Sequence, residues 1–145
     1  MNRAFLISRQ TTGVARYLSL DWIDAVAAEI DGDDGLRTLA ADPDVAVGIT
    51  QVVTDGPEGD IVYHLQVGDS TVGFAAGAAD PEHVRMEQTW DTAVAVATGE
   101  LNAQAAFING HIRLFGEQER LLAAQPIFAA LDSVFTTVAE STEYA

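Results

Sequence analysis

The sequence predicts an α+β domain in which helices cover one face of a mixed five-stranded sheet. Apolar residues alternate at every second position between residues 45 and 90, which is the period of half-buried strands. Apolar residues at helical spacing lie before this region and after it. A length of 145 residues suits one domain with a core of its own.

The domain is predicted to begin with a helix. Residues 1–18 are expected to be a loosely ordered lead-in, and Ser19 is a typical N-cap. Asp21 lies in the first turn, where the helix dipole favours an acidic side chain. Apolar spacing then predicts an amphipathic helix from Ser19 to Ile30, which the Asp- and Gly-rich run 31–35 ends.

Four alternating runs predict an antiparallel meander. They occupy residues 45–53, 61–67, 71–75 and 84–90, with tight turns between the first three. A fifth strand at Ile112 and Leu114 is separated from the others by helices. We therefore expect this strand to lie parallel to one neighbour, reached by a crossover connection.

The segment from Ala97 to Gly116 predicts the end of one helix, a short helix, a tight turn and the fifth strand. Asp91 or Thr92 is the expected cap of the first helix, and Asn102 that of the second. Two helices follow, the last opened by Pro126 in its first turn. The domain is expected to span 19–138 and to end in a tail, 139–145.

The charge of the chain excludes several partners. Its 22 acidic and 7 basic residues give a net charge of −15, which repels nucleic acids and allows at most transient contact with anionic membranes. No cysteine is present, so disulfides and thiolate chemistry are excluded. No secretory signal and no apolar span of membrane length are visible, which predicts a cytoplasmic protein.

Residue types typical of catalysis are scarce. His64, His83 and His111 are far apart and match no metal-binding spacing. The paired aspartates lie in predicted turns, where aspartate accepts hydrogen bonds from the backbone. The sequence therefore predicts no enzyme, no catalytic residue, no metal site and no cofactor.

Apolar side chains of the later helices are expected to face the sheet. From spacing alone they either interlock as a solid core or enclose a cavity, and small alanines on the same helices leave room for one. The residues concerned are Phe107, Leu121, Phe128, Leu131 and Phe135 on the helices and Tyr63, Phe74, Met86 and Leu114 on the sheet.

The runs Ala97–Asn102 and Gln104–Gly110, followed by Ile112, Leu114 and Gly116, resemble the signature of the sterol carrier protein 2 family. Residues 17–22 and 121–128 are similar to stand-alone bacterial members, and the resemblance covers roughly residues 19–135. Where the family commonly has proline, this chain has Ala103.

The resemblance implies non-catalytic binding or transfer of a hydrophobic small molecule, such as an acyl chain, a sterol-like lipid or another polycyclic lipid. The nine apolar residues above are then the ligand-binding candidates, with Tyr63, Gln88 and Arg113 near a head group. The last helix is the expected lid.

Two other functions are compatible with the sequence. The first is an interaction or accessory domain with a filled core, which forms a homodimer or docks to a partner enzyme. The second is a small cone-shaped α+β enzyme of the ketosteroid isomerase type. Such an enzyme ends on strands and needs an acid or histidine in its pocket, whereas this chain is predicted to end on helices.

Overall fold

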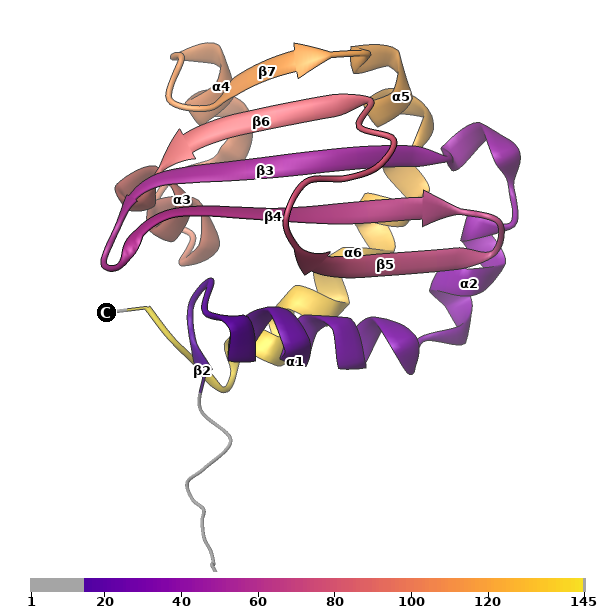
Figure 1. The fold of residues 1–145 in the computed structure, drawn as a ribbon, viewed down its shortest axis with the longest axis horizontal. Helices are drawn as coiled ribbons and strands as arrows, with labels where there is room; N and C mark the ends of the chain where they lie inside the picture. The colour runs from indigo at the N-terminus through magenta and orange to yellow at the C-terminus, as the bar shows by residue number, and fades with distance from the viewer. Residues whose placement is uncertain (1–14, 145) are drawn as a thin grey trace, which may run out of the picture.

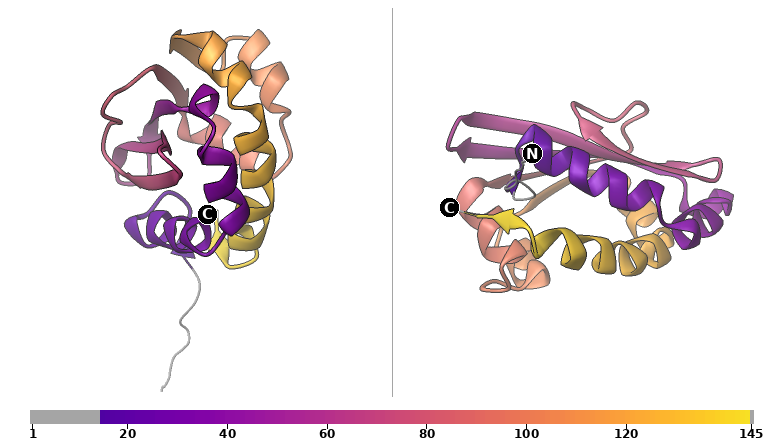
Figure 2. Two further views of the ribbon diagram at one scale, coloured as in Figure 1. Left: turned by 90° about the vertical axis from the view of Figure 1, so that its right-hand side faces the viewer. Right: turned by 90° about the horizontal axis from the view of Figure 1, so that it is seen from below.

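The structure is a computed structural model that describes residues 15–144. Its centre is a mixed five-stranded sheet with the spatial order β5-β4-β3-β6-β7 (Figure 1). The strands are β3 (Val47–Gly56), β4 (Gly59–Gly68), β5 (Thr71–Ala76), β6 (Val84–Thr89) and β7 (Arg113–Gly116). Helices cover one face of this sheet, so the predicted α+β fold class is confirmed (Figure 2).

The parallel pairing lies elsewhere than the sequence predicts. Strand β6 runs parallel to β3, with Ile49 opposite Val84, whereas β7 is antiparallel to β6. The sequence predicts that the first four strands are antiparallel and that the fifth is parallel to a neighbour. This prediction is wrong, because the fourth strand, β6, is the parallel one. The reason is the loop of residues 77–83, which crosses the outer face of the sheet before β6 begins (Figure 1). Periodicity along the chain identifies strands but does not record which strands are neighbours.

The helices form the second layer. They are α1 (Leu20–Asp31), α2 (Asp34–Ala40), α3 (Trp90–Ala97), α4 (Ala103–Ile108), α5 (Gln118–Ala123) and α6 (Gln125–Ala139), with a 3-10 turn η1 (Pro43–Val45) before β3. Figure 2 shows α1 and α6 side by side beneath the sheet. Both helices contribute buried apolar residues at helical spacing to the core.

Local capping explains where these helices begin. The Ser19 hydroxyl accepts a hydrogen bond from the Trp22 amide, and the Asn102 side chain accepts one from Ala105, as predicted. Helix α3 is capped by Thr89 rather than by Asp91 or Thr92. Strand β6 therefore leads into α3 without a connecting loop.

The two described ends of the chain lie side by side. Strand β2 (Ala15–Arg16) pairs in parallel with β8 (Thr142–Glu143). The expected lead-in and tail are thus wrong for these residues, which hold each other by backbone hydrogen bonds. Sequence alone cannot show this pairing, because two-residue strands carry no period. The rest of the lead-in, residues 1–14, lies outside the described residues.

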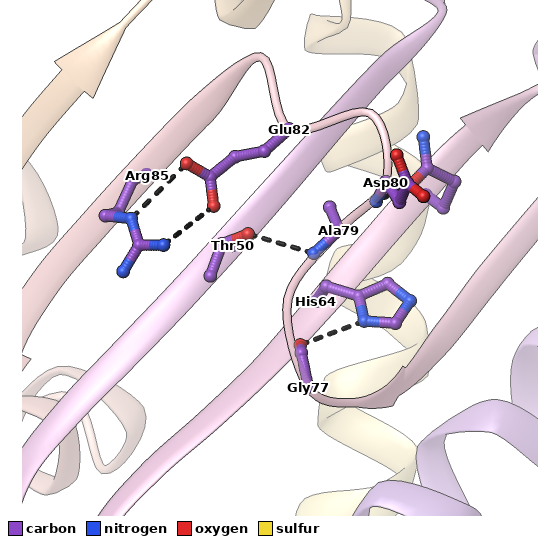
Figure 3. A network of polar contacts seen from close by, with 8 residues as sticks. Thr50, His64, Gly77, Ala79, Asp80, Glu82 and Arg85 are labelled. Atoms are coloured by element: carbon purple, nitrogen blue, oxygen red, sulfur yellow. Dashed lines mark hydrogen bonds and ion pairs between the residues drawn. The ribbon is translucent and has the colours of Figure 1, made fainter.

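The crossing loop is held to the outer face of the sheet by polar contacts (Figure 3). The Thr50 hydroxyl is fully buried and accepts a hydrogen bond from the Ala79 amide at 3.0 Å. The ring of His64 contacts the Gly77 carbonyl at 3.0 Å. Beside them, the Thr50 hydroxyl and then the Arg85 guanidinium favour the ionised form of Glu82 and lower the pKa of that carboxyl.

Gly48 is the point of closest approach between loop and sheet. Its amide donates to Nδ1 of His83 at 2.9 Å, and its carbonyl accepts from the His83 amide at 2.8 Å. A Cβ atom at residue 48 would lie 1.9 Å from the Pro81 carbonyl oxygen. Only glycine therefore allows the loop to pass at this position.

We predict that Gly48→Ala lowers the free energy of unfolding by at least about 2 kcal/mol, because either the loop or β3 must shift. Gly73→Ala is the matched control, since a Cβ there would find its nearest neighbour at 3.9 Å. That variant should stay within about 0.5 kcal/mol of the parent in urea unfolding. Equal losses in both variants would contradict the steric argument.

Candidate functional site

A cavity of about 520 Å³ lies between the inner face of the sheet and helices α3 and α6. This volume is within the range of small-molecule pockets. It is lined from the sheet by Gln51, Tyr63, Met86 and Gln88; from α3 by Ala93, Val96 and Ala97; from α6 by Asp132, Phe135, Thr136 and Ala139; and elsewhere by Tyr17, Trp22, Ile112 and Tyr144.

Sheet register explains why the strand residues meet. Tyr63 on β4 lies directly opposite Gln51 on β3, and Gln51 lies directly opposite Met86 on β6. Opposed residues share a face, so all three point into the same layer. Gln88 follows two residues after Met86 and therefore points the same way.

Small residues on the helices leave space above these strands. Ala93 and Ala97 are four residues apart on α3, so they lie on one face of that helix, and both line the cavity. Ala139 lines it from α6. Because alanine fills little volume, the helices approach the sheet here without filling the space between.

Aromatic rings form much of the remaining wall. Trp22 stacks on Phe135 with ring centroids 6.3 Å apart, and Tyr17 contacts both Trp22 at 5.1 Å and Tyr144 at 5.0 Å. Phe135 is 37% exposed, and Ala97, Asp132 and Thr136 are also exposed. The cavity therefore opens to solvent between α3 and α6.

Apolar and polar side chains share the cavity lining, the polar ones being two glutamines, three tyrosines, Thr136 and Asp132. The Oε1 atoms of Gln51 and Gln88 are buried, and neither finds a hydrogen-bond partner within residues 15–144. The Gln51 amide nitrogen donates to the Met86 sulfur at 3.4 Å. Among the described residues of the lining, Asp132 alone carries a charge.

Burial also raises the pKa values of the cavity tyrosines. Desolvation raises the pKa of Tyr63 well above its usual value, and it raises the pKa of Tyr17, where the nearby Tyr63 and Tyr144 add to the effect. Desolvation raises the pKa of Tyr144 as well. These hydroxyls are therefore protonated at any physiological pH and can donate hydrogen bonds.

The structure brings three of the nine predicted ligand-binding residues to the cavity, namely Tyr63, Met86 and Phe135. The others have different surroundings. Phe74 and Leu131 are buried in the core; Leu114, Leu121 and Phe128 pack half-buried against it; and Phe107 is 45% exposed on α4. A role in ligand binding stays a prediction for all nine.

Two of the three head-group candidates, Tyr63 and Gln88, line the cavity. Arg113 does not: its guanidinium pairs with Glu87 at 3.0 Å, and its side chain is 67% exposed.

Gln51 is not among the predicted residues, although the sequence carries a signal for it. It is polar at a position in phase with Ile49 and Val53, where alternation requires an inward apolar side chain. Tyr17 and Tyr144 have no such signal, because their place depends on the pairing of the chain ends.

The described part of the chain holds neither a metal-binding cluster nor a membrane-spanning helix. Between residues 15 and 144, no three histidine, cysteine, aspartate or glutamate side chains gather closely enough to hold a metal ion. Nor is any helix of that region both long and apolar enough to span a bilayer.

Sequence comparison and structural comparison give different results. No protein-family model matches the sequence, and no curated protein is significantly similar to it. Solved structures do match. A crystal structure of sterol carrier protein 2 has a TM-score of 0.61 at 16% identity, over 83% of this chain and 97% of the other. This chain has the sterol carrier protein 2 fold.

Two further structures show the same fold. One is a conserved hypothetical protein from Thermus thermophilus, described as possibly a sterol carrier protein, with a TM-score of 0.61 and 16% identity over 85% of this chain and 90% of the other. The other is the apo form of sterol carrier protein 2 from Yarrowia lipolytica, with a TM-score of 0.53 and 15% identity over 83% of this chain and 96% of the other. The predicted resemblance is thereby confirmed at the level of the fold.

The cavity tyrosines predict an alkaline limit of stability. The chain contains no lysine or cysteine, so its three tyrosines are the side chains that ionise near pH 10. In the unfolded chain they lose their protons there, whereas the folded state keeps Tyr17 and Tyr63 protonated. The unfolded state then binds fewer protons, so the free energy of unfolding falls as pH rises above 10, by about 1.4 kcal/mol per pH unit and tyrosine.

Tyr63→Phe should therefore reduce this slope between pH 10 and 11.5, as measured by urea unfolding. Tyr144→Phe is the control and should change the slope less, since Tyr144 is only partly buried. Identical slopes for the parent protein and Tyr63→Phe would contradict the burial of the Tyr63 hydroxyl.

Proposed function

We propose that this protein binds a lipid-like ligand in the cavity between the sheet and helices α3 and α6 and carries it without chemical change. The observation that supports this proposal most is the cavity itself, which has aromatic and aliphatic side chains in its wall and lies in a sterol carrier protein 2 fold. Each ligand methylene removed from water contributes about 0.8 kcal/mol. An acyl chain or polycyclic ring then has ample driving force before the cost of association.

The cavity also weighs against the two alternative functions. A docking domain is expected to have a filled core, yet 520 Å³ remains open beside the packed residues. An enzyme of the ketosteroid isomerase type needs a buried acid or base. Asp132 is exposed at the rim, and the rings of His64 and His83 contact backbone groups on the outer face of the sheet.

Access to the cavity is proposed to run between α3 and α6, where Ala97 and Phe135 reach the surface. Helix α6 is the proposed lid, because it ends the helical layer and supplies the outer rim. The acidic surface disfavours exchange with anionic membranes, so we propose transfer to a neutral surface or a protein partner. A homodimer, an enzyme partner and a cytoplasmic location stay predictions.

Native mass spectrometry of freshly purified protein, followed by organic extraction, tests the proposal. A bound lipid or polycyclic compound at one per chain is the expected result. A clean mass of the free protein, together with failure of added acyl lipids and sterols to bind, would overturn the proposal.

Neighbouring threonines on α6 offer a matched pair of variants. Both side chains are exposed, but Thr136 lines the cavity and the adjacent Thr137 does not. In Thr136→Trp the indole should fill the opening of the cavity. It should weaken ligand binding by at least about tenfold, since it takes up space that the ligand needs. Thr137→Trp should bind within about twofold of the parent in a fluorescent-lipid titration. Equal affinity of both variants would place the ligand elsewhere.

A further inference from the structure

Strand β7 forms an open edge of the sheet. Within the described chain β6 is its only neighbour in the sheet, so β7 is the outermost strand on that side (Figure 1). Arg113, Phe115 and Gly116 of this strand are exposed. The other edge differs, because helix α1 packs against β5. An open edge carries backbone groups that can pair with a further strand.

The hydrogen-bond pattern shows which backbone groups of β7 face the open edge. The Glu117 amide donates to the His83 carbonyl at 3.0 Å, which continues the β6–β7 register by one position. In an antiparallel pair, residues that bond to the neighbouring strand alternate with residues that do not. Phe115 therefore also bonds to β6, whereas Leu114 and Gly116 direct their N–H and C=O groups toward the open edge.

Exposed apolar side chains are concentrated in this part of the chain. Seven large apolar side chains of the described residues are exposed, and four of them lie on β7 or on the short helices before and after it. They are Phe107 and Ile108 on α4, Phe115 on β7 and Leu122 on α5. A partner on this edge would remove apolar surface from water, which favours association.

A second copy of the chain matches the edge in charge as well. Two β7 strands related by a twofold axis pair both outward-facing residues only if Leu114 of one copy lies opposite Gly116 of the other. This register places Phe115 directly beside Phe115 of the second copy, as an aromatic cross-strand pair. It also places Arg113 opposite Glu117 of the second copy, on both sides of the axis. Opposite charges at opposed positions stabilise strand pairing.

We propose that β7 is the contact strand of a homodimer in which the sheets of two copies join edge to edge. An extended segment of another protein would use the same edge, but the match of Arg113 with Glu117 is a property of two identical strands. The contact is small and each copy has a net charge of −15, so we expect a weak dimer with a Kd of about 10–100 µM.

The proposed contact is separate from the cavity. Arg113, Phe115 and Glu117 are not among the residues that line the cavity. The dimer therefore does not depend on the proposed function, and a test of one is not a test of the other.

Charge reversal tests the register, with sedimentation velocity of the full chain from about 5 to 500 µM as the measurement. Arg113→Glu and Glu117→Arg should each weaken self-association by at least about tenfold, because each puts like charges opposite one another. An equimolar mixture of the two variants should associate as the parent does, because every opposed pair then has opposite charges. Both variants stay strongly acidic, so general attraction between them would not explain such a recovery. Melting temperatures check that both variants fold.

The twofold axis allows a second test. The chain contains no cysteine, so Phe115→Cys introduces a single thiol that lies beside its counterpart in the second copy. The Cα atoms of such a pair are about 4.5 Å apart, a separation that suits a disulfide. Mild oxidation should link this variant at least about tenfold faster than Leu20→Cys, the control, whose residue is 67% exposed on α1.

Three results would each overturn the β7 dimer. They are a parent protein that stays monomeric over the whole concentration range, a mixture of the charge variants that does not recover association, and equal linking rates of the two cysteine variants. None of these measurements requires a bound lipid. Failure of the cavity to bind lipids would overturn the proposed function and leave the dimer standing.

Discussion

The parallel pairing of β3 with β6 is the constraint on which the rest of the structure depends. It places Gln51 beside Met86 and Val53 beside Gln88. Cavity residues from segments 35 residues apart in sequence thereby come together on one face of the sheet. It also requires the chain to cross the outer face of the sheet between β5 and β6 (Figure 3). Gly48, Thr50 and His64 hold that crossing, so the outer face of the sheet supports the geometry of the inner one.

Packing divides the inner layer into two parts. At one end, α1 packs against α6 and β5, and both helices bury apolar side chains such as Val26, Ile127 and Leu131 in the core. At the other end, alanines on α3 and α6 face glutamines and tyrosines, and space remains between them. The protein thus leaves part of its layer unfilled, at a cost in dispersion energy that a bound ligand would recover.

Most charged groups lie on the surface rather than in the cavity. The surface carries nearly all of the 22 carboxylates, whereas the cavity lining combines aromatic and aliphatic side chains with neutral polar ones and a single carboxylate, that of Asp132. A strongly negative exterior keeps the protein dispersed and away from anionic surfaces. A wall without cations gives no compensation to an anion. Neither property follows from the fold alone.

The sequence by itself determined the fold class, most element positions and two helix caps, because side-chain period and capping are local properties of the chain. It also indicated Tyr63, Met86, Phe135 and Gln88, whose inward direction follows from alternation or helical spacing. Only the tertiary structure decided which strands are neighbours, that the chain ends pair, and that Leu131 packs in the core whereas Phe135 borders the opening. Those outcomes depend on contacts between distant residues, and periodicity carries no information about such contacts.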